Sequence, residues 1–266
     1  TAGNQIHADG TGALILTNVA HDTTASGNKT LSLRGTNTQG NMITSVLSNN
    51  GTGVLSVTVD GGATWILTNP SNSYSGTTTV GAGALGIGDN TAIGAGTLVN
   101  SNGNIFAYGG DRTITNTLSL ANNAANGWIG DFSLTFAGAN NFAAGANNIT
   151  TNNSIVNGKA LTFEGLTADV LTGNRTWTID GPGETVVNGN FTTITGFGVN
   201  ISKVGNGILT LGTSGATSNW NQAGANIDVD RGTLKFTASN AIPITSATNG
   251  GLILSPEILT TDTATL

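Results

Sequence analysis

Glycine placed between short apolar segments is the feature that most constrains what this chain can fold into. Within residues 62–88, an alternating segment with Trp65 and Leu67 is followed by a polar turn and then by a second apolar segment that begins at Thr78. A stretch over residues 203–234 repeats that frame, with glycines again placed between leucines and a valine. Self-similarity of this kind indicates a repeating β architecture, in which each copy supplies one structural unit.

Two stretches of this frame match a known family pattern. The first has the spacing N-x-Y-x-G-x-T-x-V-x-x-G-x-L-x-x-G, met by Asn72, Tyr74, Gly76, Thr78, Val80, Gly83, Leu85 and Gly88. The second, K-x-G-x-G-x-L-x-L, runs from Lys203 to Leu211. Over about a quarter of its length the chain thus resembles the autotransporter-associated β-strand repeat, which is found in passenger regions of bacterial surface proteins.

The resemblance has gaps, and it is more specific for architecture than for activity. Extra residues surround Pro70 in the first copy, and the second copy has Trp220 and Gln222 where tyrosine and glycine are expected. Repeats of this type also occur in large surface and fibre proteins that are not autotransporters. The resemblance therefore implies an extended β-solenoid and leaves the activity open.

Two all-β architectures compete for this pattern: an antiparallel sandwich or barrel made of hairpins, and a parallel solenoid. Strand-like runs of about five residues with corners of one to four residues favour the solenoid, as do Thr and Asn in outward positions where they stack on like residues. We predict an all-β fold, a right-handed parallel β-helix (β-solenoid) forming a single elongated domain over residues 1–266. At about 20 residues a rung, the chain makes on the order of 12 rungs.

The composition narrows the function classes. Charged residues make up 8% of the chain, against about 25% in a typical protein, and the net charge is −6. The eight basic residues are scattered, so nucleic-acid binding is disfavoured; they are Lys29, Arg34, Arg112, Lys159, Arg175, Lys203, Arg231 and Lys235. No apolar run approaches the roughly 20 residues of a membrane span, so we expect no direct membrane insertion. Without cysteine, disulfides and thiolate metal sites are excluded.

Few residues qualify as sites. His7 and His21 lie near Asp9 and Asp22, but their spacing matches no metal motif, and solvated histidines in loops are the simpler interpretation. We therefore expect no metal and no cofactor.

Surface contact is the one site role that the pattern supports. Asp228 and Asp230 alternate on a predicted strand and face one side, and Trp220 lies in the polar run SNWNQ, which makes it the best candidate for an exposed aromatic ring. The other tryptophans sit in strand-like runs and are expected to be buried; they are Trp65, Trp128 and Trp177.

An enzyme is disfavoured. Parallel β-helices host polysaccharide lyases and hydrolases, which need acids clustered on one face, whereas these fourteen acids are dispersed. Six aspartates sit beside turn residues, where Asp normally bonds to local backbone; they are Asp60, Asp89, Asp111, Asp131, Asp169 and Asp180. No catalytic residues are assigned, and no G-x-S-x-G elbow occurs.

Three functions remain. The first is a structural or adhesive surface protein, a rigid stalk or assembly subunit of passenger type, at the cell surface or outside the cell. The second is a phage or virus-like fibre, spike or capsid-decoration protein, at the surface of a virion. The third, a carbohydrate-active β-helix enzyme, would require three or more acids together on one face.

The expected partners are proteins, reached through solenoid edges or lateral packing, self-assembly included, and a glycan or host-surface receptor. A solenoid exposes unpaired backbone at both ends, and neither end of this sequence reads as a cap. We therefore expect the 266 residues to be part of a longer chain or to be capped by other subunits.

Overall fold

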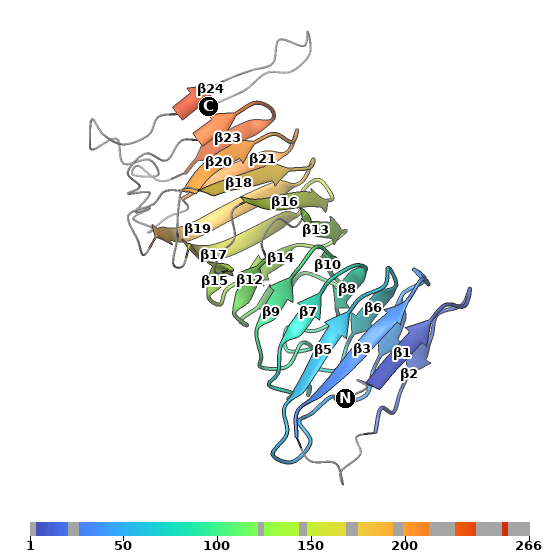
Figure 1. Cartoon of the computed structure of the whole chain (residues 1–266). Coiled ribbons are helices and arrows are strands. Elements are labelled where there is room, and N and C mark those ends of the chain that lie inside the picture. Colours follow the sequence, from blue (N-terminus) through green and yellow to red (C-terminus); the bar gives the residue numbers. More distant parts are fainter. Residues whose placement is uncertain are drawn as a thin grey trace.

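The computed structural model describes residues 4–20, 27–121, 125–143, 148–168, 175–193, 199–212, 227–237 and 252–254. All regular structure in these residues is β-strand, and the strands stack along one axis in chain order, from β1 and β2 at one end to β23 and β24 at the other (Figure 1). None of the described residues belongs to a helix long and apolar enough to cross a membrane.

Two long sheets form the walls of the stack. The first sheet contains, in spatial order, β1 (Asn4–Ala8), β3 (Lys29–Gly35), β5 (Leu55–Val59), β7 (Thr78–Val80), β9 (Leu98–Asn100), β12 (Leu118–Leu120), β15 (Asn140–Phe142), β17 (Ala160–Ala168), β19 (Glu184–Thr193), β21 (Ile208–Leu211) and β23 (Thr233–Phe236). Two further strands, β11 (Arg112–Ile114) and β14 (Leu134–Phe136), pair with each other, and β14 joins this sheet through β17.

The second sheet runs beside the first through the whole stack. Its spatial order is β2 (Ile15–Leu16), β4 (Asn41–Ile43), β6 (Thr64–Leu67), β8 (Ala84–Ile87), β10 (Asn104–Ala107), β13 (Ala125–Gly130), β16 (Asn148–Ile155), β18 (Arg175–Asp180), β20 (Val199–Lys203), β22 (Ile227–Val229) and β24 (Leu252–Leu254).

The strand pairing confirms the parallel β-solenoid and shows that the hairpin alternative is wrong. All pairings between the described strands are parallel and join neighbouring coils, for example β6 with β8 and β8 with β10. The antiparallel contact found in the described residues is one isolated bridge, between Asn50 and Gly53. Parallel neighbours need a crossover between them, and here the rest of each coil supplies it.

Coil length is not constant at the predicted value of about 20 residues. Gly86 pairs with Phe106, 20 residues later, whereas Thr151 pairs with Ile179, 28 residues later. Part of the extra length lies in the strands, since β16 (Asn148–Ile155) has 8 residues and β17 (Ala160–Ala168) has 9, against 4 in β8 and 3 in β9.

The core is one continuous apolar column between the sheets. The apolar residues of the repeat frame point inward and are all buried, namely Leu67, Val80, Leu85, Leu209, Leu211 and Leu234. They alternate with outward residues because successive side chains of a strand point to opposite faces. Burial of the three described tryptophans is likewise confirmed, since Trp65, Trp128 and Trp177 have no exposed surface.

Aromatic rings fill the middle of this column. The ring centroids of Trp128 and Phe136 lie 5.2 Å apart, those of Phe136 and Phe163 lie 6.0 Å apart, and those of Phe163 and Trp177 lie 6.1 Å apart. These distances fall within the favourable range for edge and offset ring contacts. The tryptophans of the central coils are therefore part of the core and are not available as binding platforms.

The residues of the family-like motif have structural roles. The Asn72 side chain accepts a hydrogen bond from the Leu47 amide (2.8 Å) and donates one to the Ala92 carbonyl (2.6 Å), so it links its own coil to the coils before and after it. The buried Tyr74 hydroxyl lies 2.7 Å from the Thr78 hydroxyl. The motif therefore specifies how coils stack, and it carries no chemistry of its own.

Gly76 of that motif is required by close approach. A Cβ at Gly76 would lie less than 3.0 Å from the carbonyl oxygen and carbon of Leu55 and from the hydroxyl of Ser56 in the preceding coil. Real Cβ atoms essentially never come this close to backbone. The corner can pack against the preceding coil only because no side chain stands there.

Asparagine is used differently from the prediction. The sequence places Asn in outward positions, yet several asparagines are buried inside the coils; they are Asn37, Asn41, Asn72, Asn100, Asn126, Asn140 and Asn153. The Asn41 amide shows the reason, since it donates to the Thr64 carbonyl of the next coil (2.9 Å) and its oxygen accepts from the Leu14 amide of the previous one (3.0 Å). A buried corner leaves backbone groups that need partners, and Asn supplies both a donor and an acceptor.

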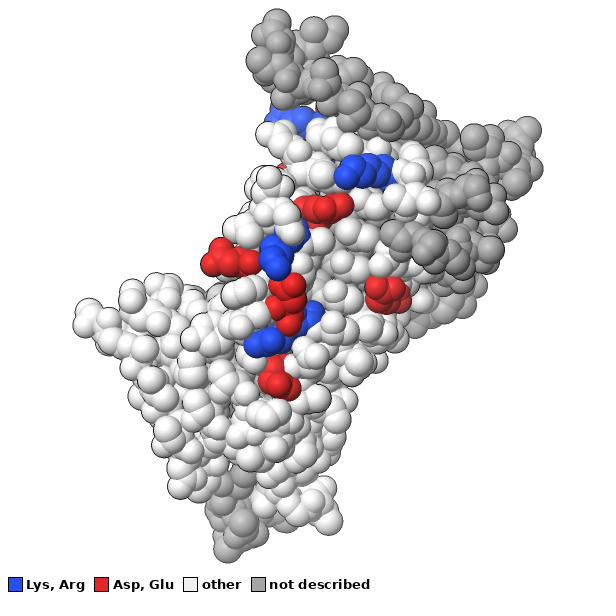
Figure 2. Space-filling view, turned by 180° about the vertical axis from the view of Figure 1, so that it is seen from behind, with Lys and Arg blue, Asp and Glu red and all other residues white. Residues whose placement is uncertain are grey.

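Charge is sparse on the surface, since charged residues make up 8% of the chain. On the face shown in Figure 2, the charged side chains gather in a band along the stack, and the lower, N-terminal part of the face shows none. Two ion pairs join neighbouring or nearby coils, Arg34 with Asp60 (2.9 Å) and Lys159 with Asp111 (3.0 Å). Both pairs are partly exposed, so they contribute little to stability.

Candidate functional site: an aromatic groove on the second sheet

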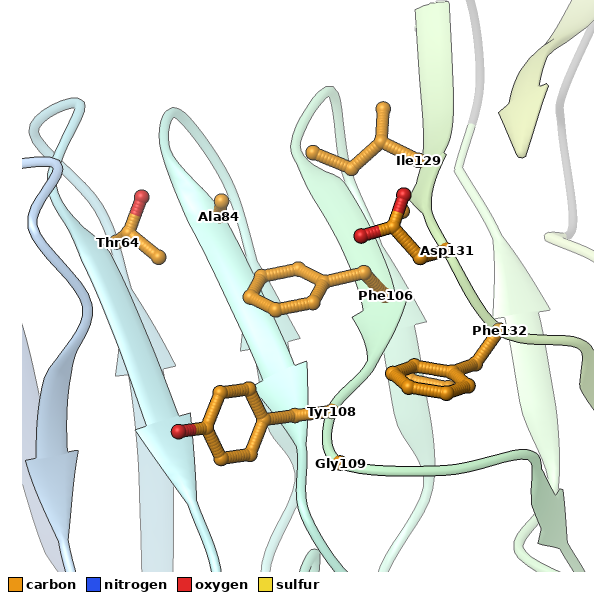
Figure 3. Close-up of a pocket in the computed structure, with 10 residues that line it drawn as sticks. Thr64, Ala84, Phe106, Tyr108, Gly109, Ile129, Asp131 and Phe132 are labelled. Carbon is orange, nitrogen blue, oxygen red and sulfur yellow. The ribbon is translucent and has the colours of Figure 1, made fainter. Parts of the chain in front are cut away.

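A groove of about 490 Å³ crosses the outer face of the second sheet. It extends over β6, β8, β10 and β13 and the turns after β10 and β13, as Figure 3 shows. Its lining is mostly apolar, and the residues are Thr64, Ala84, Phe106, Ala107, Tyr108, Gly109, Ile129, Gly130, Asp131 and Phe132. We call this feature the aromatic groove.

The alternation of β10 places an aromatic ring on the outside of the solenoid. Ile105 and Ala107 point inward and are buried, so Phe106 between them points outward. Phe106 pairs with Gly86, and a Cβ at Gly86 would lie 2.7 Å from Cζ of Phe106 and 2.9 Å from Cγ1 of Ile66. The Phe106 ring and Ile66 therefore meet above Gly86, which explains why Ile66 is only 4% exposed although it faces outward. The floor of the groove is thus a packed apolar surface.

Tyr108 forms one end of the groove and is 40% exposed. Its amide donates to the Ile87 carbonyl (2.9 Å), which fixes the backbone at the start of the turn. Arg112 then ties the turn together, because its guanidinium donates to the carbonyls of Tyr108 (2.6 Å) and Ile87 (3.3 Å). The exposed ring is therefore mounted on a turn that is held by several hydrogen bonds.

Asp131 departs from the prediction that six turn aspartates bond to local backbone. Four of them bond to backbone amides as expected: Asp60 to Gly61, Asp89 to Thr91, Asp111 to Ser133 and Asp180 to Gly181, at 2.7–3.0 Å. Asp169 lies outside the described residues. Asp131 is exposed, and its carboxylate makes no hydrogen bond or ion pair within the described part of the chain. In Figure 3 that carboxylate points toward the Phe106 ring, so it is available to the groove.

The turn hydrogen bonds also shift two pKa values. The backbone amide of Thr91, then its hydroxyl, hold the pKa of Asp89 below its ordinary value. The Ser133 amide and then the Lys159 ammonium do the same for Asp111. The carboxylates of Asp89 and Asp111 are bonded within the turns, so Asp131 is the acid that faces the groove.

The arrangement can bind a small ligand. It combines an apolar floor, the rings of Tyr108 and Phe132 at the sides, and two polar groups, the Asp131 carboxylate and the Tyr108 hydroxyl. The volume lies within the range of about 300–1,000 Å³ that is usual for ligand pockets. No group of three or more His, Asp or Glu side chains that could hold a metal ion occurs among the described residues.

The predicted contact residues do not meet the aromatic groove. Trp220 lies outside the described residues. Asp228 is on β22, half-buried, and pairs with Ser202 of β20. Burial, and then the nearby Asp230, raise the pKa of its carboxyl, and its Oδ1 atom has no hydrogen-bond partner. That the two acids form a surface contact stays a prediction.

Of the two histidine candidates, the structure describes His7, which belongs to no group of three or more metal-binding side chains among the described residues. His7 is on the exposed strand β1 and not in a loop as predicted, with Nδ1 3.9 Å from Asp9 and Nε2 3.1 Å from the Gln5 amide oxygen. His21 and Asp22 lie outside the described residues.

Lys203 of the family-like motif lies inside the solenoid, where it is 1% exposed. Its ammonium donates to the carbonyl of Gly205 and, at 3.4 Å, to that of Arg231 in the next coil. Burial lowers its pKa to about 8, and Asp180 opposes this shift. The lysine is a structural link between corners.

Sequence reasoning missed the groove, although signals for it were present. The ring predicted to be exposed is a tryptophan, whereas the rings in the groove belong to Phe106, Tyr108 and Phe132. Tyr108 is one of only two tyrosines and stands outside the repeat motif that uses the other. It also precedes two glycines, which marks it as a turn residue.

Comparison with known proteins gives one partial likeness. The chain is 43% identical over 67 residues to a protein of Brucella suis biovar 1 (strain 1330), the adhesin BmaC autotransporter. The match covers 24% of this chain and 2% of that protein, so the chain spans only a small part of its relative. No protein-family model matches the chain. No solved structure matches it either.

Proposed function

We propose that this chain is a rigid β-solenoid segment of an adhesive surface protein of autotransporter passenger type, displayed outside the cell. The observation that carries the proposal is the 43% identity to an autotransporter adhesin, in a chain whose described strands form a parallel solenoid. The roles of Asn72, Tyr74 and Gly76 in stacking support it, because a surface stalk needs a motif that repeats structure.

A stalk places binding groups away from the cell and holds them in fixed positions. Parallel pairing of eleven strands in the second sheet gives a stiff wall along the stack, since each coil is hydrogen-bonded to both neighbours. The sparse charge suits this role as well, because like charges stacked about 4.8 Å apart on successive strands would repel.

Location and adhesion are tested separately. Antibodies raised against the chain should label intact cells of the bacterium that makes it, and external protease should remove that label. Polystyrene beads coated with the chain should then adhere to epithelial monolayers more than beads coated with an unrelated solenoid. Labelling only after permeabilisation would contradict surface display, and equal adherence of the two kinds of bead would contradict the adhesive role. Labelling of purified virions instead would favour the fibre or spike function.

A further inference from the structure

The aromatic groove has the chemistry of a site for an uncharged sugar ring. Pyranoses present a face of C–H bonds and a rim of hydroxyl groups. The C–H face packs on aromatic rings, and the hydroxyl rim needs hydrogen-bond acceptors and donors. Phe106, Tyr108 and Phe132 supply rings, while Asp131 and the Tyr108 hydroxyl supply the acceptor and the donor.

The two polar groups are free to act on a ligand. The Asp131 carboxylate and the Tyr108 hydroxyl have no hydrogen-bond partner within the described part of the chain, whereas the carboxylates of Asp60, Asp89, Asp111 and Asp180 are bonded to backbone amides. A carboxylate that accepts from a hydroxyl makes a charge-assisted hydrogen bond, which is about twice as strong as a neutral one. The groove therefore offers one strong polar contact beside an apolar floor.

The charge of the groove selects among sugars. Asp131 is the one charged residue in its lining. The Arg112 guanidinium lies outside the lining, and it donates hydrogen bonds to the carbonyls of Tyr108, Ile87 and Asp111. A uronic or sialic acid would place a second negative charge beside Asp131 with no basic residue in the lining to pair with it, so the site favours a neutral ring.

We propose that the aromatic groove binds a neutral pyranose, with the sugar face packed on Phe106 and Tyr108 and its hydroxyls bonded to Asp131. The proposal deepens the proposed adhesive function, since such a sugar would be part of the surface to which the protein adheres. The adhesive function and the sugar site are tested by different measurements. Surface labelling and bead adherence test the adhesive role, and direct binding to the purified chain tests the groove.

Saturation-transfer NMR with the purified 266-residue chain tests the site. The probes are the methyl β-glycosides of glucose, galactose and N-acetylglucosamine, with methyl β-glucuronide as the anionic analogue. We expect transfer from aromatic protons to the ring C–H protons of at least one neutral glycoside. The glucuronide should bind about tenfold more weakly than that glycoside.

Variants assign the binding to the groove. Tyr108→Ala and Asp131→Asn should each weaken the affinity for the neutral glycoside about tenfold. Asp131→Asn should in addition narrow the difference between the neutral and the anionic probe. Val156→Ala is the matched control, since Val156 is 42% exposed and lies outside the groove lining, and it should leave the affinity unchanged. Circular dichroism of each variant checks that the fold is retained.

Several results would overturn the proposal. They are the absence of transfer to all three neutral glycosides, an affinity that Tyr108→Ala and Asp131→Asn leave unchanged, and stronger binding of the glucuronide. A groove occupied by a second copy of the chain would also overturn it. In that case sedimentation would show a dimer that Tyr108→Ala dissociates.

Discussion

Raising the pH from 7 to 9.5 should stabilise this protein through a single buried lysine. Lys203 is 1% exposed, and burial lowers its pKa from the ordinary value of 10.5 to about 8. Between these two values the unfolded chain binds a proton that the folded chain releases. Stability therefore rises with pH across this range.

The magnitude follows from the two pKa values. A difference of one pKa unit corresponds to about 1.4 kcal/mol, so the free energy of unfolding should rise by about 2 kcal/mol between pH 7 and pH 9.5. The pH series ends at 9.5 because the ionisation of Tyr74 lowers the stability of the folded chain at higher pH. Burial raises the pKa of its phenol, so above about pH 10 the unfolded chain loses that proton first and stability falls.

Urea unfolding at pH 7, 8, 9 and 9.5, followed by tryptophan fluorescence and circular dichroism, measures the effect. Lys203→Met should abolish the rise, since no buried ammonium remains to lose its proton. Lys235→Met is the matched control, because Lys235 lies on the adjacent coil but is exposed, and this variant should keep the rise. The reasoning is refuted if the wild-type chain gains no stability over this range, or if Lys203→Met gains as much as the wild type.

Three other predictions concern packing and charge. Gly76→Ala should destabilise the fold by about 1–3 kcal/mol because its Cβ would strike Leu55 of the preceding coil, whereas Gly12→Ala, with no atom within 4 Å, should be nearly neutral in the same urea titration. Leu209→Ala should lower the free energy of unfolding by about 2–5 kcal/mol through the cavity that it leaves. Ile15→Ala, at a 57% exposed position, should lower it by about 0.5 kcal/mol or less. Equal losses would show that the buried column does not determine stability. Raising NaCl from 0.05 to 1 M should move the melting temperature by no more than about 2 °C in a calorimeter, because the two ion pairs with Asp60 and Asp111 are partly exposed, and a large shift would mean that charge matters more than packing.

The sequence alone was sufficient for the architecture. Alternating apolar residues and glycines at fixed offsets are a local signal, so the inward position of Leu67, Val80 and Leu209 was predictable and is confirmed. The same holds for the three described tryptophans. Such positions follow from the two-residue period of a strand, which needs no knowledge of the neighbouring coils.

The tertiary structure decided what depends on contacts between coils. Tyr108 and Asp131 belong to successive coils, and they share a groove only because β10 pairs with β13 in one register. The coils differ in length from 20 to 28 residues, so a period read from the sequence does not say which outward residues become neighbours. The burial of asparagine side chains and the lowered pKa of Lys203 have the same origin. In both cases the coils above and below determine how deeply the side chain is buried and which groups it can bond to.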